Sequence, residues 1–224
     1  MGYIGKFPTA VPITTSDLAD GIVTTSKLAN DSVNASKFDE TDNYAFTGTV
    51  TGTPAGLVKT GSLVSTTDAG SYSLDNCFNS TYLNYFVTFK FAIATDTNNC
   101  RFRLRAGGST RTDTLYNAFI RYGDNTAGTG TFNHSYDDYI NIGTDLEATD
   151  TKAIQGYMYI FSPYSSSYIT NMTVHYNSIT SGGYRRMHYG GMQFDSTISL
   201  DGFQLTQNTG NGSLADIQCW GIKE

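Results

Sequence analysis

Charge, cysteine and long apolar runs are all scarce in this chain, and each scarcity excludes a class of protein. Charged residues make up 15% of the 224 residues, and 14 Lys and Arg stand against 20 Asp and Glu, a net charge of −6. Nucleic-acid binding requires a basic surface, so no nucleic-acid partner is expected. No window of about 18 apolar residues occurs, so neither a membrane-spanning helix nor membrane insertion is expected.

Cysteine pairs and catalytic motifs are missing as well. The three cysteines, Cys77, Cys100 and Cys219, are odd in number and form no C-x-x-C pair. Neither a disulfide framework nor a zinc site is therefore predicted, and the cysteines are expected to be small buried residues of a protein made in a reducing cytoplasm. The chain has no G-x-S-x-G, no H-E-x-x-H and no P-loop. We therefore expect a protein that is not an enzyme and holds no cofactor or metal.

What the sequence does contain is a repeat of ten residues over positions 11–40. Its three rows are VPITTSDLAD, GIVTTSKLAN and DSVNASKFDE, and they align without gaps. Each row is typical of a short strand followed by one helical turn, and it is too small to bury its own apolar side chains. Copies in other chains can bury them, so residues 11–42 are predicted to be an oligomeric stem. The packing positions are Ile13, Leu18, Val23, Leu28, Val33 and Phe38.

The alternative for this repeat is an ordinary amphipathic helix over residues 13–38. Gly21 and the β-branched pairs disfavour a helix, and a period of ten is not a helical multiple of seven or eleven. Residues 1–10 are predicted to be an extended segment that anchors the chain through Tyr3, Ile4 and Phe7, with a frayed tail as the alternative. Residues 43–56, NYAFTGTVTGTPAG, are typical of an extended Thr/Gly linker or of a narrow β segment between chains.

From residue 57 to 224 the pattern is that of β-strands. Alternation is clear in 100–105, where arginines 101, 103 and 105 alternate with Phe102 and Leu104. Turn signals rich in Gly, Asn, Ser and Asp separate the apolar runs, so we predict an all-β domain, an antiparallel β-sandwich of jelly-roll type. The expected strands cover 57–64, 85–94, 100–105, 115–121, 156–161, 168–176, 186–194, 197–206 and 214–222.

Two Tyr-rich stretches are the candidate binding sites for a receptor. The first follows the turn at 181–183 and comprises Tyr184, Arg185, Arg186, His188 and Tyr189. The second comprises Tyr164 and Tyr168 on a serine loop, after Tyr157 and Tyr159. A sugar face stacks on an aromatic ring while Arg and His donate hydrogen bonds to its hydroxyl groups. The alternative is that these tyrosines line the core or a trimer interface.

Two charged clusters have simpler interpretations. His134, beside Asp137 and Asp138, is expected to be a polar loop residue, because nothing near it supplies further metal ligands. The arginines 101, 103 and 105 could be solvated, could pair with Asp residues of a neighbouring subunit, or could contact an acidic lipopolysaccharide.

The beginning and the end of the chain together resemble a known family. The residues concerned are MGYIGKFPTAVPITTSDLADGIVTTSKLANDSVNASKF, then FTGTVTGT, and finally DGFQL and GNGSLADIQCWGI. In this combination the chain resembles the tail-fibre and fibre-like virion proteins of marine bacteriophages. The resemblance implies a virion component made in the host cytoplasm, a homotrimer whose N-terminus attaches to other tail or capsid proteins. Its distal domain would bind a host surface glycan or protein during adsorption.

Two other functions remain open at this point. The chain could be a structural decoration or joint protein of a tail or head fibre, with no receptor. It could also be a glycan hydrolase or esterase, but phage enzymes that cleave polysaccharides carry paired carboxylates on a much larger β-helix.

Overall fold

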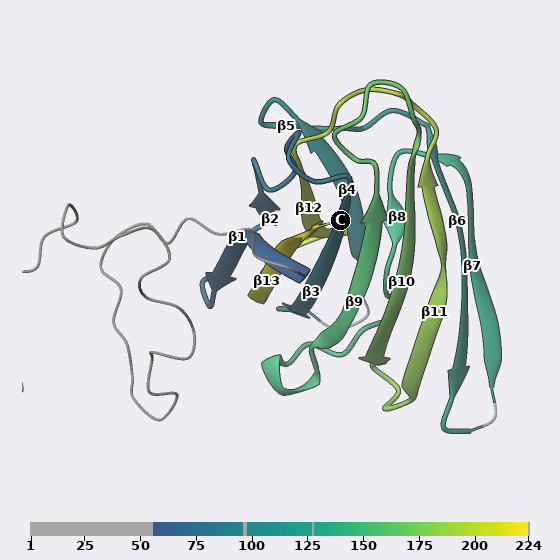
Figure 1. The fold of residues 1–224 in the computed structure, drawn as a ribbon. Helices are drawn as coiled ribbons and strands as arrows, with labels where there is room; N and C mark the ends of the chain where they lie inside the picture. The colour runs from purple at the N-terminus through teal and green to yellow at the C-terminus, as the bar shows by residue number, and fades with distance from the viewer. Residues whose placement is uncertain (1–55, 96–97, 127, 224) are drawn as a thin grey trace, which may run out of the picture. The chain divides into compact units, whose positions relative to one another are not determined.

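The computed structural model describes residues 56–95, 98–126 and 128–223 (Figure 1). The predicted anchor, the stem and all but the last residue of the predicted linker lie outside these residues. Gly56, which was assigned to the linker, already begins the first strand. No helix in the described part of the chain is long and apolar enough to cross a lipid bilayer.

The strands form two antiparallel sheets (Figure 1). The eight-stranded sheet has the order β1 (Gly56–Ser65), β13 (Gly212–Lys223), β3 (Asn84–Ile93), β9 (Ile154–Phe161), β10 (Thr170–Ile179), β11 (Arg185–Phe194), β6 (Tyr116–Asp124) and β7 (Thr129–Asp137). The five-stranded sheet has the order β2 (Ser71–Leu74), β12 (Gly202–Gln207), β4 (Cys100–Ala106) and β5 (Ser109–Thr110), and β8 (Ile140–Asn141) also pairs with β4. A single turn of 3-10 helix, η4 (Asp150–Lys152), precedes β9.

The predicted all-β, antiparallel two-sheet fold is confirmed for residues 56–223. Each of the nine predicted strand ranges overlaps an observed strand, although 197–201 precede β12 rather than belonging to it. The strands β2, β5, β7 and β8 were not predicted. The sequence of β7, TGTFNHSYD, is rich in turn-forming residues, and its pairing with β6 holds it extended.

Strand alternation builds the core between the two sheets. In β3 the side chains of Tyr85, Val87, Phe89 and Phe91 are buried, while those between them point to the opposite face. From the other sheet, Tyr72 of β2 meets the ring of Phe91 edge-on at 5.8 Å. The two layers therefore bury one shared apolar cluster, to which both contribute aromatic side chains.

A buried tyrosine also ties the sheets together by hydrogen bonds. The hydroxyl group of Tyr116 on β6 accepts a bond from the backbone N–H of Leu104 on β4 at 2.9 Å and donates to the carbonyl of Arg111 at 3.0 Å. Burial raises the pKa of Tyr116, so the hydroxyl stays protonated and able to donate. The three cysteines are free and buried, as predicted.

Candidate functional site

The two predicted groups of receptor-binding residues lie at opposite ends of strand β10. Tyr164 and Tyr168 are on the loop between β9 and β10, next to the pair Asn171–Phe161. Tyr184 and the start of β11 lie beyond the other end, next to the pair Ile179–Arg185. A strand of ten residues separates them, about 33 Å at the usual rise. The structure therefore does not combine them into one site.

Strand alternation also divides the group on β11. Arg185 and Tyr189 point to the outer face of the eight-stranded sheet, the face opposite the core, whereas Arg186 and His188 point inward. The guanidinium carbon of Arg186 lies 4.5 Å from the ring centroid of Tyr122 on β6. Tyr184 is 44% exposed and Tyr189 is 49% exposed, so both are open to a ligand.

His188 is buried, and this corrects its prediction as a receptor-contacting residue. Its side chain has no exposed area, and its Nε2 lies 2.9 Å from the hydroxyl group of Ser178. Burial, with the nearby charge of Arg186, lowers the pKa of His188 to about 3. His188 is therefore a neutral packing residue that no ligand at the surface can reach.

The outer face of the eight-stranded sheet carries a continuous series of aromatic rings, which we call the aromatic track. Its members come from β13, β3, β9, β10 and β11 and are Trp220, Phe86, Tyr159, Tyr157, His175 and Tyr189. Register explains their contact, because Trp220 pairs with Phe86 and Phe86 with Tyr159. In the next row, His175 pairs with both Tyr157 and Tyr189.

Adjacent rings of the aromatic track are in contact distance. Phe86 lies 5.8 Å from Trp220 and 5.1 Å from Tyr159, measured between centroids. His175 stacks on Tyr157 at 5.7 Å and lies 6.1 Å from Tyr189. Tyr157, Tyr159 and Tyr189 are between 38% and 49% exposed. These tyrosines do not line the core, and an exposed aromatic surface of this kind is typical of a binding site.

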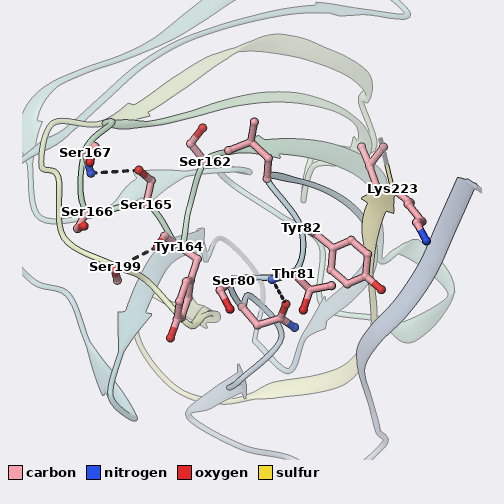
Figure 2. Close-up of a pocket in the computed structure, with 13 residues that line it drawn as sticks. Ser80, Thr81, Tyr82, Ser162, Tyr164, Ser165, Ser166, Ser167, Ser199 and Lys223 are labelled. Atoms are coloured by element: carbon pink, nitrogen blue, oxygen red, sulfur yellow. Dashed lines mark hydrogen bonds between the residues drawn. The ribbon is translucent and has the colours of Figure 1, made fainter. Parts of the chain in front are cut away.

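One member of the second predicted group, Tyr164, lines a pocket, the serine pocket, shown in Figure 2. Its volume is about 680 Å³, and its walls are the loop from Asn79 to Leu83, the loop from Ser162 to Ser167, Ser199 and the end of β13 at Ile222 and Lys223. Tyr164 and Tyr82 are its two aromatic side chains, whereas Tyr168 is exposed but does not line it.

Internal hydrogen bonds hold the serine pocket in shape. The hydroxyl oxygen of Ser165 accepts bonds from the backbone N–H groups of Ser167 and Tyr168, each at 3.1 Å. Ser199 donates its hydroxyl to the carbonyl of Tyr164 at 3.1 Å. Ser162 has a φ of 56°, a left-handed conformation that costs a non-glycine residue about 1 kcal/mol or more.

The chemistry of the serine pocket is that of hydrogen bonding to a polar ligand. The hydroxyl groups of Ser80, Thr81, Ser162, Ser166 and Ser167 make no hydrogen bond to other described residues. Lys223 is the one charged side chain among the described residues that line the pocket. No carboxylate or imidazole is among them.

The two arginines at the start of β11 border a separate hollow of about 540 Å³. Asn125 accepts a hydrogen bond from the backbone N–H of Arg185 at 2.9 Å, which fixes the entrance to the strand. Asp124 accepts bonds from the side-chain hydroxyl and backbone N–H of Thr126, and these lower the pKa of its carboxyl group. Asp124 is also the register partner of Arg186 across β6 and β11, so a carboxylate of the same chain lies near that arginine.

Two of the three arginines on the outer face of β4 are paired with carboxylates of the same chain. Arg103 pairs with Asp138 at 2.6 Å, and Arg105 pairs with Asp75 at 2.5 Å. The guanidinium carbon of Arg101 lies 4.0 Å from the ring centroid of Tyr139. The sequence left open whether these arginines are solvated, pair with Asp residues of a neighbouring subunit or contact lipopolysaccharide. The contacts show pairing with Asp residues for Arg103 and Arg105, but within the same subunit.

His134 lies on strand β7, which corrects its prediction as a loop residue. Its Nδ1 is 2.6 Å from the carboxylate of Asp137, and its Nε2 accepts the backbone N–H of Asn141 at 3.2 Å. Both ring nitrogens are therefore engaged in structural contacts. Within residues 56–95, 98–126 and 128–223, no three His, Cys, Asp or Glu side chains converge in a way that could hold a metal ion.

Three members of the aromatic track were not predicted from the sequence: Phe86, Trp220 and His175. The sequence does carry a signal for Phe86. It alternates with the buried residues of β3 and must therefore lie on the opposite face of the strand. Comparison with protein-family models, with curated proteins and with solved structures found no match for this chain. The candidate sites therefore rest on geometry and on the chemistry of their side chains.

Proposed function

We propose that this chain is a fibre-type virion protein of a bacteriophage, and that its C-terminal β domain binds the surface of the host cell. The observation that carries the proposal is the aromatic track, whose exposed rings lie on one face of the eight-stranded sheet. The ten-residue repeat before this domain supports it, because a repeat of that kind is suited to holding several copies of a chain together.

The proposed arrangement assigns one task to each part of the chain. Residues 1–10 attach to another virion protein through Tyr3, Ile4 and Phe7, and residues 11–42 hold three chains together. The domain after the linker is a sandwich of jelly-roll type that binds a host surface glycan or protein without covalent chemistry. Three such domains on one fibre raise the effective affinity well above that of a single domain, because the second and third contacts are intramolecular.

An adsorption experiment tests this proposal. Saturating full-length protein is expected to slow the adsorption of the particle that carries this chain. A variant with Tyr157→Ser, Tyr159→Ser and Tyr189→Ser is expected to compete poorly, because three exposed rings are lost. A control with Tyr136→Ser and Val64→Ser removes side chains that are 60% and 69% exposed outside the track, and it should compete as well as the parent.

Imaging of the particle with antibodies against the full chain separates the proposal from its rivals. Chain on the particle together with failed competition would support a structural decoration or joint protein. A chain that is absent from the particle would contradict the virion assignment itself. Shortened oligosaccharides after incubation with host polysaccharide would instead favour the glycan hydrolase.

A further inference from the structure

A hollow of about 520 Å³ lies on the outer face of the eight-stranded sheet, where β10, β11 and β6 run side by side. Its rim consists of two rows of cross-strand partners. In one row Thr173 pairs with Gly191, and Gly191 pairs with Phe119. In the other row the partners carry side-chain amides and are Asn171, Gln193 and Asn117. We call this feature the Gly191 hollow, because the middle residue of the first row has no side chain.

The fold itself does not require a glycine at position 191. A Cβ atom placed there would meet nothing within 4 Å, and the residue does not have a positive φ. At Gly190, by contrast, an added Cβ would lie 2.2 Å from the backbone oxygen of Phe119, so no side chain fits. Glycine weakens a strand unless something must approach the backbone closely. No described residue makes such an approach at Gly191.

The neighbouring aromatic ring leaves the hollow open. A ring next to a strand glycine often folds over it and fills the gap. Here nothing lies within 4 Å of the added Cβ at Gly191, and Phe119 is 55% exposed. Phe119 therefore stands as one wall of the hollow with its ring accessible to a ligand.

The polar groups around the hollow are uncharged and largely unused. The side chains of Asn171, Thr173 and Gln193 make no hydrogen bonds to other described residues. Asn117 uses its carbonyl oxygen to accept the backbone N–H of Tyr136 at 3.1 Å. No Asp, Glu, Lys or Arg is among the residues lining the hollow, and the two nitrogens of His134 there are already engaged.

We infer that the Gly191 hollow binds a neutral sugar ring. The apolar C–H face of a pyranose stacks on an exposed aromatic ring such as Phe119. Amides and hydroxyl groups both donate and accept, which matches the hydroxyl groups of a sugar. An acidic sugar would bring a charge that no side chain lining the hollow neutralises. This inference rests on the proposed function, since it names the ligand class of the same face.

The aromatic track continues the site for a longer glycan. Thr173 pairs with Tyr159 on its other side, so one row across the sheet runs from Trp220 and Phe86 to Tyr159, the hollow and Phe119. Neighbouring strands are about 4.8 Å apart, so a saccharide of several residues can lie along this row. Arg121, two residues beyond Phe119 on the same face, lies outside the lining of the hollow.

The test uses full-length protein and panels of neutral, uronic-acid and sulfated oligosaccharides, with binding measured by calorimetry. Gly191→Leu places a side chain in the hollow and is expected to weaken neutral-sugar binding by about tenfold or more, which corresponds to about 1.4 kcal/mol. Gly123→Leu is the matched control, because an added Cβ at Gly123 on β6 also meets nothing within 4 Å but lies outside the hollow. The control should bind as the parent does, and both variants should melt at similar temperatures.

Several results would overturn the inference. These are the absence of any neutral ligand in the panel, a preference for acidic sugars, and unchanged binding by Gly191→Leu. A change in oligomeric mass of Gly191→Leu would identify a second copy of the chain as the occupant instead. If Gly191→Leu still competes for adsorption as the parent does, the hollow is not the receptor site while the proposed function stands. If the parent itself fails to compete, the proposed function falls as well.

Discussion

The imidazole of His188 lies face to face with the phenol ring of Tyr176, with ring centroids 4.2 Å apart and planes inclined by 8°. The two residues are register partners on β11 and β10, and both are buried. The ring of Phe132 lies 5.5 Å from the imidazole, and Nδ1 has no hydrogen-bond partner among the described residues. A protonated imidazole would be poorly solvated here, which is why burial depresses its pKa.

The stability of the domain should therefore fall on acidification. The pKa of His188 is about 3 in the folded protein, against an ordinary value of 6.5. Between these values the unfolded chain binds the proton and the folded chain does not, so stability is lost as pH decreases. The free energy of unfolding should fall by about 1.4 kcal/mol for each pH unit below 6.5, or by about 2 kcal/mol at pH 5.

Urea unfolding at pH 7 and pH 5 measures this effect. The double variant His188→Phe and Ser178→Ala removes the imidazole together with its hydrogen-bond partner, so no buried hydroxyl is left unpaired. From pH 7 to pH 5, the free energy of unfolding of the double variant should fall by about 2 kcal/mol less than that of the parent. Equal losses in both proteins would show that other groups cause the acid sensitivity.

Two adjacent glycines on β11 should respond in opposite ways to alanine. Gly190→Ala forces a Cβ atom to within 2.2 Å of the oxygen of Phe119 and 2.6 Å of the Cα of Ile120, so β11 and β6 must separate. We expect Gly190→Ala to lower the free energy of unfolding by about 1–3 kcal/mol or more. Gly191→Ala meets open space and should be neutral or stabilising by up to about 1 kcal/mol. Thermal unfolding of both variants checks this, and similar melting temperatures would contradict it.

Two phenylalanines on β3 should separate stability from binding. Phe91 is fully buried against Tyr72, so Phe91→Ala should cost about 3–5 kcal/mol of unfolding free energy. Phe86 lies on the outer face in the aromatic track, so Phe86→Ala should cost about 1 kcal/mol but weaken competition for adsorption. Denaturation and adsorption assays on the same preparations test this. Equal destabilisation by Phe86→Ala and Phe91→Ala would mean that other protein covers the outer face of the eight-stranded sheet.

The ion pair between Arg105 and Asp75 should contribute more than a surface pair does. Arg105 is 9% exposed and also donates hydrogen bonds to Thr110 and to the carbonyl of Gly108. Asp75→Asn leaves the charge of Arg105 poorly compensated. The free energy of unfolding is expected to fall by about 1–3 kcal/mol. In the control, Asp113→Asn removes the partner of Arg111 from a more exposed pair and should cost less than about 1 kcal/mol. Equal costs in chemical denaturation would contradict the distinction.

Light scattering tests the proposed stem. The full chain is expected to have a mass of three chains of 24.4 kDa at micromolar concentration. Replacing Leu18, Leu28 and Phe38 by Ser should dissociate it, because each loses about 1.5–3 kcal/mol of apolar burial per chain. A monomeric parent would contradict the interpretation of the repeat. An intact oligomer in the triple variant would locate assembly in the β domain.

Local patterns predicted most strands but not which face each side chain occupies. In β3 the alternation is clear enough to separate Phe86 from Phe89. In β11, RRMHYGGMQF, polar and apolar residues do not alternate cleanly. The sequence therefore does not indicate which of His188 and Tyr189 faces the solvent. A shift of one residue moves a side chain to the opposite face, and only the packing of Phe194 and Met192 in the core sets that phase.

Patterns along the chain establish an all-β domain, the approximate positions of most of its strands, and a ten-residue repeat before it. These features depend on interactions between neighbours in the chain, which periodicity records. Strand pairing across the folded domain places Trp220 beside Phe86 and Gly191 between Thr173 and Phe119. Such contacts join segments that are far apart in sequence. Their register is set by how the whole sheet buries its inner face, and no local pattern encodes it.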